Sequence, residues 1–201
     1  MKILGLECST RRAGVVVIED GHVLAEASWD EPRAQHEALF QHIPLVLEQA
    51  RVRIADIDVF AVGRGPGAFS GVRVALTAAN AFALPFGKKV YAVSSGEALA
   101  NIEMKRRSAT RITIAGDARR GTLWFGVFGP AGQEQAWTVG PVTDFKDGLV
   151  VSPDAKRLAD LGVRSEEAYP TALAVAELAR ARIAAGVPSD PLEPLYMHPP
   201  V

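Results

Sequence analysis

The chain has 201 residues, 48% of them hydrophobic and 22% charged, a composition typical of one globular domain or two small ones rather than of disorder or a fibre. Its 22 Lys and Arg residues and 23 Asp and Glu residues give a net charge of −1, which excludes a global positive field for nucleic acid or an anionic membrane. The single cysteine, Cys8, excludes an intramolecular disulfide and a cysteine-built zinc site.

Neither a signal peptide nor a membrane span is expected. The amino terminus reaches an acid at Glu7 before an apolar signal core could form. The longest weakly polar stretch, Val74–Gly87, is shorter than the ~20 residues that a membrane span needs. These features predict a cytoplasmic protein.

Strand and helix signals alternate along the first half of the chain. An apolar strand is followed by a hairpin that turns at Asp20-Gly21, then by helices and short strands in alternation. This order indicates a mixed sheet with helices on its faces. The expected elements are strands Lys2–Cys8, Gly14–Glu19, Gly21–Trp29, Val59–Gly63 and Lys89–Val93 and helices Ala34–Arg51 and Ser70–Leu84.

The opening pattern recurs later in the chain. Strand Arg111–Ala115 leads to Asp117, an Arg pair and strand Thr122–Phe128, just as the first strand leads to Glu7, Arg11-Arg12 and a second strand. The two acids lie 110 positions apart. This pattern indicates either a duplicated half or two unrelated hairpins.

The second half contains fewer strong elements than the first. Seven Gly and Pro residues interrupt 130–168, leaving room for short strands such as Leu149–Val151 but not for two full helices. A helix is expected over Thr171–Ala185, and the proline-rich tail after it should be extended. We therefore expect an amino-terminal subdomain over 1–105 and a reduced carboxy-terminal subdomain over 106–201.

The segment GRGPGAFSGVR, residues 63–73, is the strongest local signal. Its glycines let the backbone approach a ligand, and the helix that follows presents free N–H groups to an anion. Arg73 in the first helical turn calls for an anionic neighbour, either a ligand phosphate or an acid such as Asp56 or Asp58. An internally satisfied glycine turn is the alternative. The candidate anion or nucleotide residues are Ser9, Thr10, Gly65, Gly67, Arg73 and Asp117.

Metal and nucleophile chemistry find little support. No two of the four histidines are three or four residues apart, the spacing that places two imidazoles on one helical face. Cys8 ends a buried strand, where an inert core thiol is favoured. We therefore predict no metal site and no catalytic residue.

The helix expected over Ser70–Leu84 is apolar nearly all round. Only Arg73, Thr77 and Asn80 interrupt it, on one stripe about 60° wide. A helix lying on its own sheet needs only one apolar face, so either the preceding helix covers this one or another chain does. The residues predicted to face a partner or a second copy are Ala38, Leu45, Val72, Ala75, Leu76, Ala79, Phe82 and Ala83.

Six segments together resemble the bacterial TsaB (YeaZ) family of tRNA threonylcarbamoyladenosine biosynthesis proteins, which is Gcp-like and related to the M22 glycoproteases. They are ILGLECST (3–10), QHEALFQHIPLVLE (35–48), AVGRGPGAFSGVRV (61–74), VSSGEALA (93–100), AGDARRGTLWFGVF (115–128) and EPLYM (193–197). The resemblance implies an α/β, duplicated actin-like fold (ASKHA, ribonuclease H-like) with a reduced second half.

The resemblance also implies a role. Such proteins act with the catalytic subunit TsaD and the ATPase TsaE to transfer a threonylcarbamoyl group to the adenosine beside the anticodon. Ser95 and Leu99 stand where the catalytic relative has the two histidines of its metal-binding H-M-E-G-H, so the transfer centre is expected to be lost. Glu7 stands where the family usually has Asp, which weakens a nucleotide role for that turn.

Three functions compete at this point. The first is a non-catalytic scaffold that binds the catalytic subunit, pairs with itself when alone and meets tRNA indirectly. The second is an autonomous actin-like ATP-dependent phosphotransferase, and the third, disfavoured by the histidine spacing, is a metallopeptidase. No firmly bound cofactor is expected, although a nucleotide at the subunit interface is left open.

Overall fold

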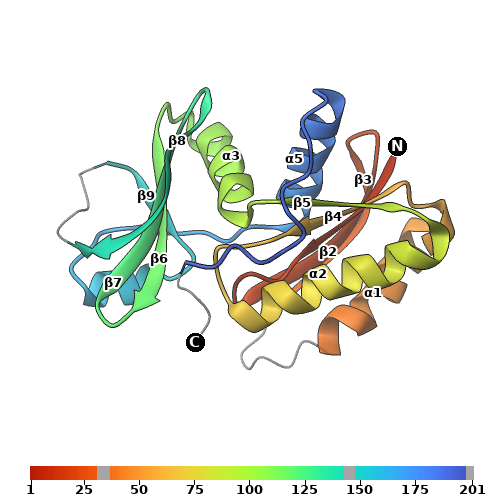
Figure 1. Cartoon of the computed structure of the whole chain (residues 1–201), viewed down its shortest axis with the longest axis horizontal. Coiled ribbons are helices and arrows are strands. Elements are labelled where there is room, and N and C mark those ends of the chain that lie inside the picture. Colours follow the sequence, from red (N-terminus) through yellow and green to blue (C-terminus); the bar gives the residue numbers. More distant parts are fainter. Residues whose placement is uncertain (31–36, 143–147, 198–201) are drawn as a thin grey trace. The chain divides into compact units, whose positions relative to one another are not determined.

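The computed structural model describes residues 1–30, 37–142 and 148–197. These residues form two compact units. Of the described residues, one unit combines those within 1–98 with 170–195, and the other combines 99–142 and 148–169 with 196–197. The sequence-based subdomains 1–105 and 106–201 stay a prediction, but the carboxy-terminal helix packs in the first unit (Figure 1).

A five-stranded mixed sheet forms the centre of the first unit. Three antiparallel strands are followed by two parallel ones, in the order β3-β2-β1-β4-β5. The hairpin turns at Asp20 and Gly21, both with positive φ, as the sequence predicts. The strands are β1 (Lys2–Glu7), β2 (Arg12–Glu19), β3 (His22–Asp30), β4 (Val59–Gly63) and β5 (Lys89–Val93).

Helices cover both faces of this sheet. Figure 1 shows α1 (Glu37–Ala50) and α2 (Phe69–Ala83) on one face and α5 (Ala172–Ala184) on the other. The 3-10 turns η1 (Ile54–Asp56) and η2 (Leu84–Phe86) follow α1 and α2. The helix expected from Ala34 is described only from Glu37 on, because 31–36 lie outside the described residues.

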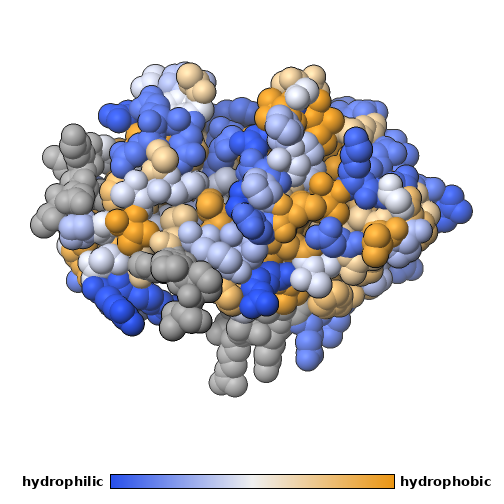
Figure 2. All heavy atoms as spheres, viewed as in Figure 1, coloured by the Kyte–Doolittle hydropathy of each residue, from blue (hydrophilic) through white to orange (hydrophobic). Residues whose placement is uncertain are grey.

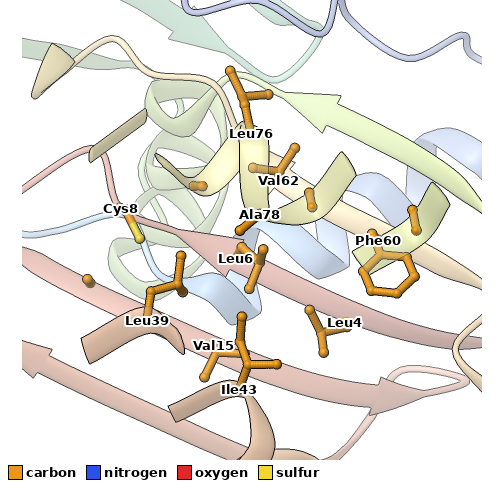
Figure 3. Packing of buried hydrophobic residues seen from close by; sticks show 14 of the residues in the cluster. Leu4, Leu6, Cys8, Val15, Leu39, Ile43, Phe60, Val62, Leu76 and Ala78 are labelled. Atoms are coloured by element: carbon orange, nitrogen blue, oxygen red, sulfur yellow. The ribbon is translucent and has the colours of Figure 1, made fainter. Parts of the chain in front are cut away.

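The main core lies between the sheet and the pair α1 and α2. Leu4, Leu6 and Val15 point from the strands toward Leu39 and Ile43 of α1, all at most 1% exposed (Figure 3). These positions follow the period of two in a strand and of 3.6 in a helix, which is why the sequence pattern predicted them. The thiol of Cys8 is buried in the same cluster, as expected for a core cysteine.

The opposite face of the sheet brings α5 unusually close to β1. A Cβ at Gly5 would lie 2.7 Å from the carbonyl oxygen of Ala172 and 3.0 Å from the Cβ of Ala176. Glycine on the strand and alanine on the helix therefore set the distance between these two elements.

The second unit repeats the sheet of the first. Its strand order is β10-β9-β6-β7-β8, with β6 antiparallel to β7 and parallel to β9. This is the order of the first sheet read from the other edge, so the duplication is confirmed, and with it the actin-like fold class. The strands are β6 (Ile112–Arg119), β7 (Thr122–Gly129), β8 (Gly132–Pro141), β9 (Val150–Ser152) and β10 (Glu166–Glu167).

Two elements of this part of the chain were not expected from the sequence. Helix α3 (Ser95–Arg107) follows β5, and the edge strand β8 follows β7. Only a short helix, α4 (Ala155–Asp160), lies between β9 and β10, in line with the reduced second half.

Gly5→Ala should lower the free energy of unfolding by about 1–3 kcal/mol, because the new methyl group meets backbone and side-chain atoms that cannot all move away. Urea unfolding followed by circular dichroism measures this loss. Gly14→Ala is the matched control, since its methyl would meet only one atom closer than 3.6 Å and should cost less. Equal losses at the two positions would contradict the close packing of α5 on β1.

Candidate functional site

Three segments meet at one edge of the first sheet. They are the turn Glu7–Thr10 after β1, the glycine loop Gly63–Gly67 after β4, and Ser94-Ser95 at the start of α3. Because β1, β4 and β5 are parallel neighbours, their carboxyl ends lie at the same edge and place these segments together.

The carboxyl group of Glu7 is the centre of this site. The residue is completely buried, and its Oε1 accepts a hydrogen bond of 2.5 Å from the amide of Ser9. A side chain at position 63 would overlap Oε2, so Gly63 leaves the space that this carboxyl fills. Within the described part of the chain, Oε2 has no hydrogen-bond partner.

Burial raises the pKa of Glu7 above its ordinary value, and the hydrogen bonds from Ser9 oppose this shift only in part. A carboxylate in this place would lose its hydration without gaining a cation, so the neutral acid is favoured. Because the side chain is completely buried, a substrate in solvent cannot reach this carboxyl.

The glycine loop closes over the turn. The amide of Ala68 donates to the carbonyl oxygen of Ser9 at 2.6 Å, and a side chain at Gly67 would overlap that same oxygen. Gly65, with φ of 94°, donates from its amide to Ser95 Oγ at 3.0 Å and accepts from the Ser95 amide at 2.8 Å. The close approach that the glycines predicted is therefore made by the protein's own backbone.

The candidate anion residues of this unit receive internal contacts. Ser9 is 1% exposed, and the Thr10 hydroxyl bonds to the backbone of Arg12, donating at 3.0 Å and accepting at 3.2 Å. The guanidinium of Arg73 lies 5.0 Å from the ring centre of Phe69 on the exposed side of α2. The structure brings Ser9, Gly65 and Gly67 together, and nucleotide binding there stays a prediction.

The acids expected to balance Arg73 have other partners. Asp56 forms an ion pair with Arg53 at 2.7 Å, and Asp58 accepts a hydrogen bond from the amide of Lys2 at 2.7 Å. The cation–π contact with Phe69 supplies a favourable neighbour of another kind, which the sequence reasoning missed. The spacing of the two residues, one helical turn apart, is the signal that could have shown it.

Asp117 occupies the matching place in the second unit. Its Oδ1 accepts a hydrogen bond of 2.9 Å from the amide of Arg119, two residues later in the chain. Glu7 makes the same contact with the amide of Ser9. The amide of Asp117 donates to Asp154 at 3.0 Å, and Arg157 lies 3.6 Å from Oδ2. Unlike Glu7, Asp117 therefore has a cation beside it and is partly exposed.

Ser95 and Leu99 lie one turn apart on α3, and both are buried, at 0% and 1% exposure. The Ser95 hydroxyl accepts a hydrogen bond from the Gly65 amide of the glycine loop, and Leu99 packs in the core of the second unit. Residues 1–30, 37–142 and 148–197 contain no cluster of three His, Cys, Asp or Glu side chains that could hold a metal. Two histidines, His36 and His198, lie outside these ranges.

The predicted partner residues need correction. Val72, Ala75, Leu76, Ala79 and Ala83 are at most 5% exposed and face the chain's own core, so they cannot touch a partner directly. A helical-wheel pattern shows which residues share a stripe but not the direction of that stripe, and here it points to the sheet. Ala38 and Phe82 are half-buried, and Leu45 is 49% exposed, so these three stay available.

The outward side of α2 mixes polar and apolar residues. Arg73, Thr77 and Asn80 are exposed, as the narrow polar stripe predicted. Although Phe69–Phe86 has the length and hydropathy of a membrane span, its apolar stripe is the core-facing one. The helix is therefore part of the folded α/β unit.

Several exposed apolar residues of this region were missed by the sequence reasoning. Phe40 on α1 contacts Phe82 on α2, with ring centres 6.4 Å apart. Leu84, directly before Pro85 at the end of α2, is 81% exposed. Figure 2 shows apolar side chains exposed between hydrophilic ones on one face of the molecule. We define the α1–α2 face as the exposed apolar residues Phe40, Leu45, Phe69, Leu84 and Phe86.

Comparison with known sequences gives one family match. The sequence profile of the family described as TsaD, tRNA N6-adenosine threonylcarbamoyltransferase, matches residues 31–177. The tRNA threonylcarbamoyladenosine biosynthesis protein TsaB of Escherichia coli is 30% identical over 125 residues, which is 62% of this chain and 54% of that protein. A tRNA N6-adenosine threonylcarbamoyltransferase of Caldivirga maquilingensis is 34% identical over 53% of this chain and 35% of that protein.

Comparison with solved structures shows the fold. YeaZ from Pseudomonas aeruginosa superposes with a TM-score of 0.82 at 24% identity, covering 97% of this chain and 99% of that one. The matches thus span about half the length of the first curated relatives but nearly all of the YeaZ structure.

Glu7→Gln should change how stability depends on pH. Because the pKa of Glu7 is raised by burial, its contribution to folding is full below its ordinary pKa of 4.5 and is lost as pH rises toward the folded-state pKa. As pH rises from 4.5 toward the folded-state pKa, wild type should therefore lose stability relative to Glu7→Gln, by up to about 1.4 kcal/mol per pH unit. Urea unfolding at a series of pH values measures the difference.

Glu103→Gln is the control with the opposite sign. Burial alone would raise the pKa of Glu103, but hydrogen bonds from Arg106 and Arg107 outweigh it and lower the pKa. Its contribution is therefore present above pH 4.5 and lost as pH falls through the folded-state pKa. A wild-type advantage over Glu7→Gln that grows with pH would contradict the raised pKa of Glu7.

Proposed function

Because this chain belongs to the tRNA N6-adenosine threonylcarbamoyltransferase family, whose profile matches 31–177, we propose that it is a non-catalytic subunit of the machinery that makes threonylcarbamoyladenosine in tRNA. In this role it binds a TsaD-type catalytic subunit and holds it in an active state. A TsaE-type ATPase completes the complex, and tRNA modification is the shared output. The work takes place in the cytoplasm.

The observation that carries this proposal is the state of Ser95 and Leu99. These residues stand where two metal-binding histidines are expected in the catalytic relative, and neither side chain can coordinate a metal as an imidazole does. Both residues are buried. The Ser95 hydroxyl accepts a hydrogen bond from the Gly65 amide, and Leu99 packs in a hydrophobic core. These contacts support a structural role for both residues rather than a role in metal binding.

The neighbouring groups support the same conclusion. Glu7 is a fully buried acid with a raised pKa, and Ser9 beside it is buried as well. Phosphoryl transfer needs groups that reach a bound nucleotide and its metal ion, whereas these groups are sealed by the glycine loop. An autonomous phosphotransferase therefore has less support than a scaffold.

The α1–α2 face is the proposed contact for the catalytic subunit. It carries three Phe and two Leu residues, each at least 43% exposed, and aromatic residues dominate the energetics of many interfaces. Leu84 is the most exposed of them at 81%. The same face would join two copies of this chain when the catalytic subunit is absent.

Replacing Leu84 with Glu should weaken binding to a TsaD-type subunit by at least 10-fold, because a charge would have to be desolvated at the contact. The free energy of unfolding should change by less than about 0.5 kcal/mol, since the side chain is exposed. Co-purification and calorimetric titration with the catalytic subunit measure the affinity.

Val23→Glu is the matched control. Val23 is an apolar residue of the same unit, 43% exposed on edge strand β3 and outside the α1–α2 face. Its replacement should leave the affinity unchanged. Unaltered binding by Leu84→Glu, or equal loss in both variants, would count against this face.

The proposed role itself is tested by reconstitution. An unmodified tRNA transcript is incubated with the TsaD-type subunit, the TsaE-type ATPase, ATP and the threonylcarbamoyl donor, with and without this chain. Modified adenosine should form at a much higher rate when the chain is present. Equal rates in both reactions would overturn the scaffold function.

A further inference from the structure

The segment after α5 lies along the outer edge of the first sheet. We define the strap as residues 187–195, which leave α5 and cross β5 (Figure 1). Because β5 is the last strand in the order of this sheet, its outer row of backbone groups is left for other partners. The strap meets this row at an antiparallel bridge between Ala92 and Asp190. It therefore covers the edge without adding a full strand.

Little apolar surface holds the strap in place. Val187 and Leu192 are 43% and 46% exposed, and Pro188 and Pro191 are exposed as well. The prolines at 188, 191 and 194 also have no backbone N–H to donate to β5. The seated position of the strap therefore depends mainly on a few polar contacts.

Hydrogen bonds fix the first half of the strap to β5. Ala92 donates its amide to Ser189 Oγ at 2.9 Å, and its carbonyl oxygen accepts from the amide of Asp190 at 3.1 Å. The hydroxyl of Tyr91 donates to the carbonyl oxygen of Val187 at 2.6 Å. These contacts come from two successive residues of one edge strand, so they form a single point of attachment.

An arginine on α5 adds a charged contact. The Arg182 guanidinium donates to the Asp190 carboxylate at 3.0 Å and to Glu97, in the first turn of α3, at 2.5 Å. The side chains of Arg182 and Asp190 are 18% and 27% exposed, so water screens this ion pair only in part. One cation thus joins α5, the strap and the start of α3.

The second half of the strap holds the glycine loop. The amide of Leu195 donates to the carbonyl oxygen of Arg64 at 2.8 Å, and Arg64 Nε donates to the carbonyl oxygen of Glu193 at 2.9 Å. The same loop covers the turn after β1, where the Ala68 amide donates to Ser9. The loop therefore has two sets of contacts, one to the strap and one to the turn that begins at the buried acid.

We propose that the strap is a latch that opens independently of the rest of the first unit, and that its release loosens the glycine loop over Glu7 and Ser9. A segment held by polar contacts at the surface opens at a lower free energy than a buried core. On release the loop loses both contacts of Arg64 and keeps those to Ser95 and Ser9. The Glu7 carboxyl, which is completely buried under the closed loop, then gains transient access to solvent.

Asp190→Asn tests the latch in the full chain, because it removes the charge of the contact and keeps the size of the side chain. Arg182 retains Glu97 as its partner, so the variant leaves this cation paired. Tyr91→Phe is a second variant, since it removes the hydroxyl that donates to Val187 without changing any charge. Both variants should release the strap more often than wild type does.

Hydrogen exchange followed by NMR measures the opening at three backbone amides. The amide of Ala92 donates to the strap, that of Leu195 to the glycine loop, and that of Ala68 to the turn after β1. In Asp190→Asn the first two should exchange on the order of 10-fold faster, and the third at least about threefold faster. Tyr91→Phe should accelerate the same three amides. The amides of β1, in the middle of the sheet, should keep their wild-type rates.

Asp56→Asn is the matched control. Asp56 also pairs with an arginine of the same unit, Arg53, at 2.7 Å, but it lies in η1, outside the strap and the glycine loop. Its replacement removes the same charge from the chain. The three amides should therefore exchange within about twofold of their wild-type rates.

The outcomes decide between a latch and ordinary packing of the tail. Faster exchange at Ala92, Leu195 and Ala68 in both variants, with unchanged rates in β1, supports the latch. Unchanged rates, acceleration confined to the strap contacts, an effect that Tyr91→Phe does not share, or an equal change in Asp56→Asn overturns it. An equal increase in β1 also overturns it, because the whole unit would then unfold together. The measurements use this chain alone and are therefore independent of the proposed scaffold function.

Discussion

Burial of the Glu7 carboxyl is the constraint on which the candidate site depends. Among the residues that the structure describes, no cation pairs with this group, so the fold accommodates it through a hydrogen bond from Ser9 and through the space that Gly63 leaves for its second oxygen. Ser95 then ties the glycine loop to the start of α3. Three segments that are far apart in the sequence thus meet around one buried acid.

The duplication allows one local motif to be compared in two environments. In each unit an acid at the end of a strand, Glu7 or Asp117, accepts a hydrogen bond from the backbone amide two residues later. The loop after β4 covers the first turn. In the second sheet the short strand β9 holds the place of β4, and α4 after it brings Arg157 beside Asp117. The loop after the fourth strand, rather than the turn itself, therefore decides whether the motif is sealed or open.

Much of the fold could be predicted from the sequence because its signals are strong and local. Alternating apolar residues and the Asp20-Gly21 turn define the first three strands, and the recurrence at Asp117 indicates the repeat. Helix α3 was missed because Gly96 and a charged carboxyl-terminal end leave it without a clear apolar stripe. Its first turn belongs to the first compact unit and the rest to the second, so no single core sets its pattern. Strand β8 was missed because few of its residues are apolar and glycine or proline stands at its ends, and most of the strand is exposed, as befits an edge.

The site could be predicted only in part, because sequence shows what a backbone can approach but not what it does approach. The glycines at 63 and 67 signal close contact correctly, yet the contact partners are Glu7 and Ser9 of the same chain. Likewise the apolar stripe of α2 is real, but it faces the sheet, and the residues left for a partner lie at helix ends and on α1. The exposed residues Phe40 and Leu84, which the apolar stripe did not indicate, are therefore the ones that the proposed contact uses.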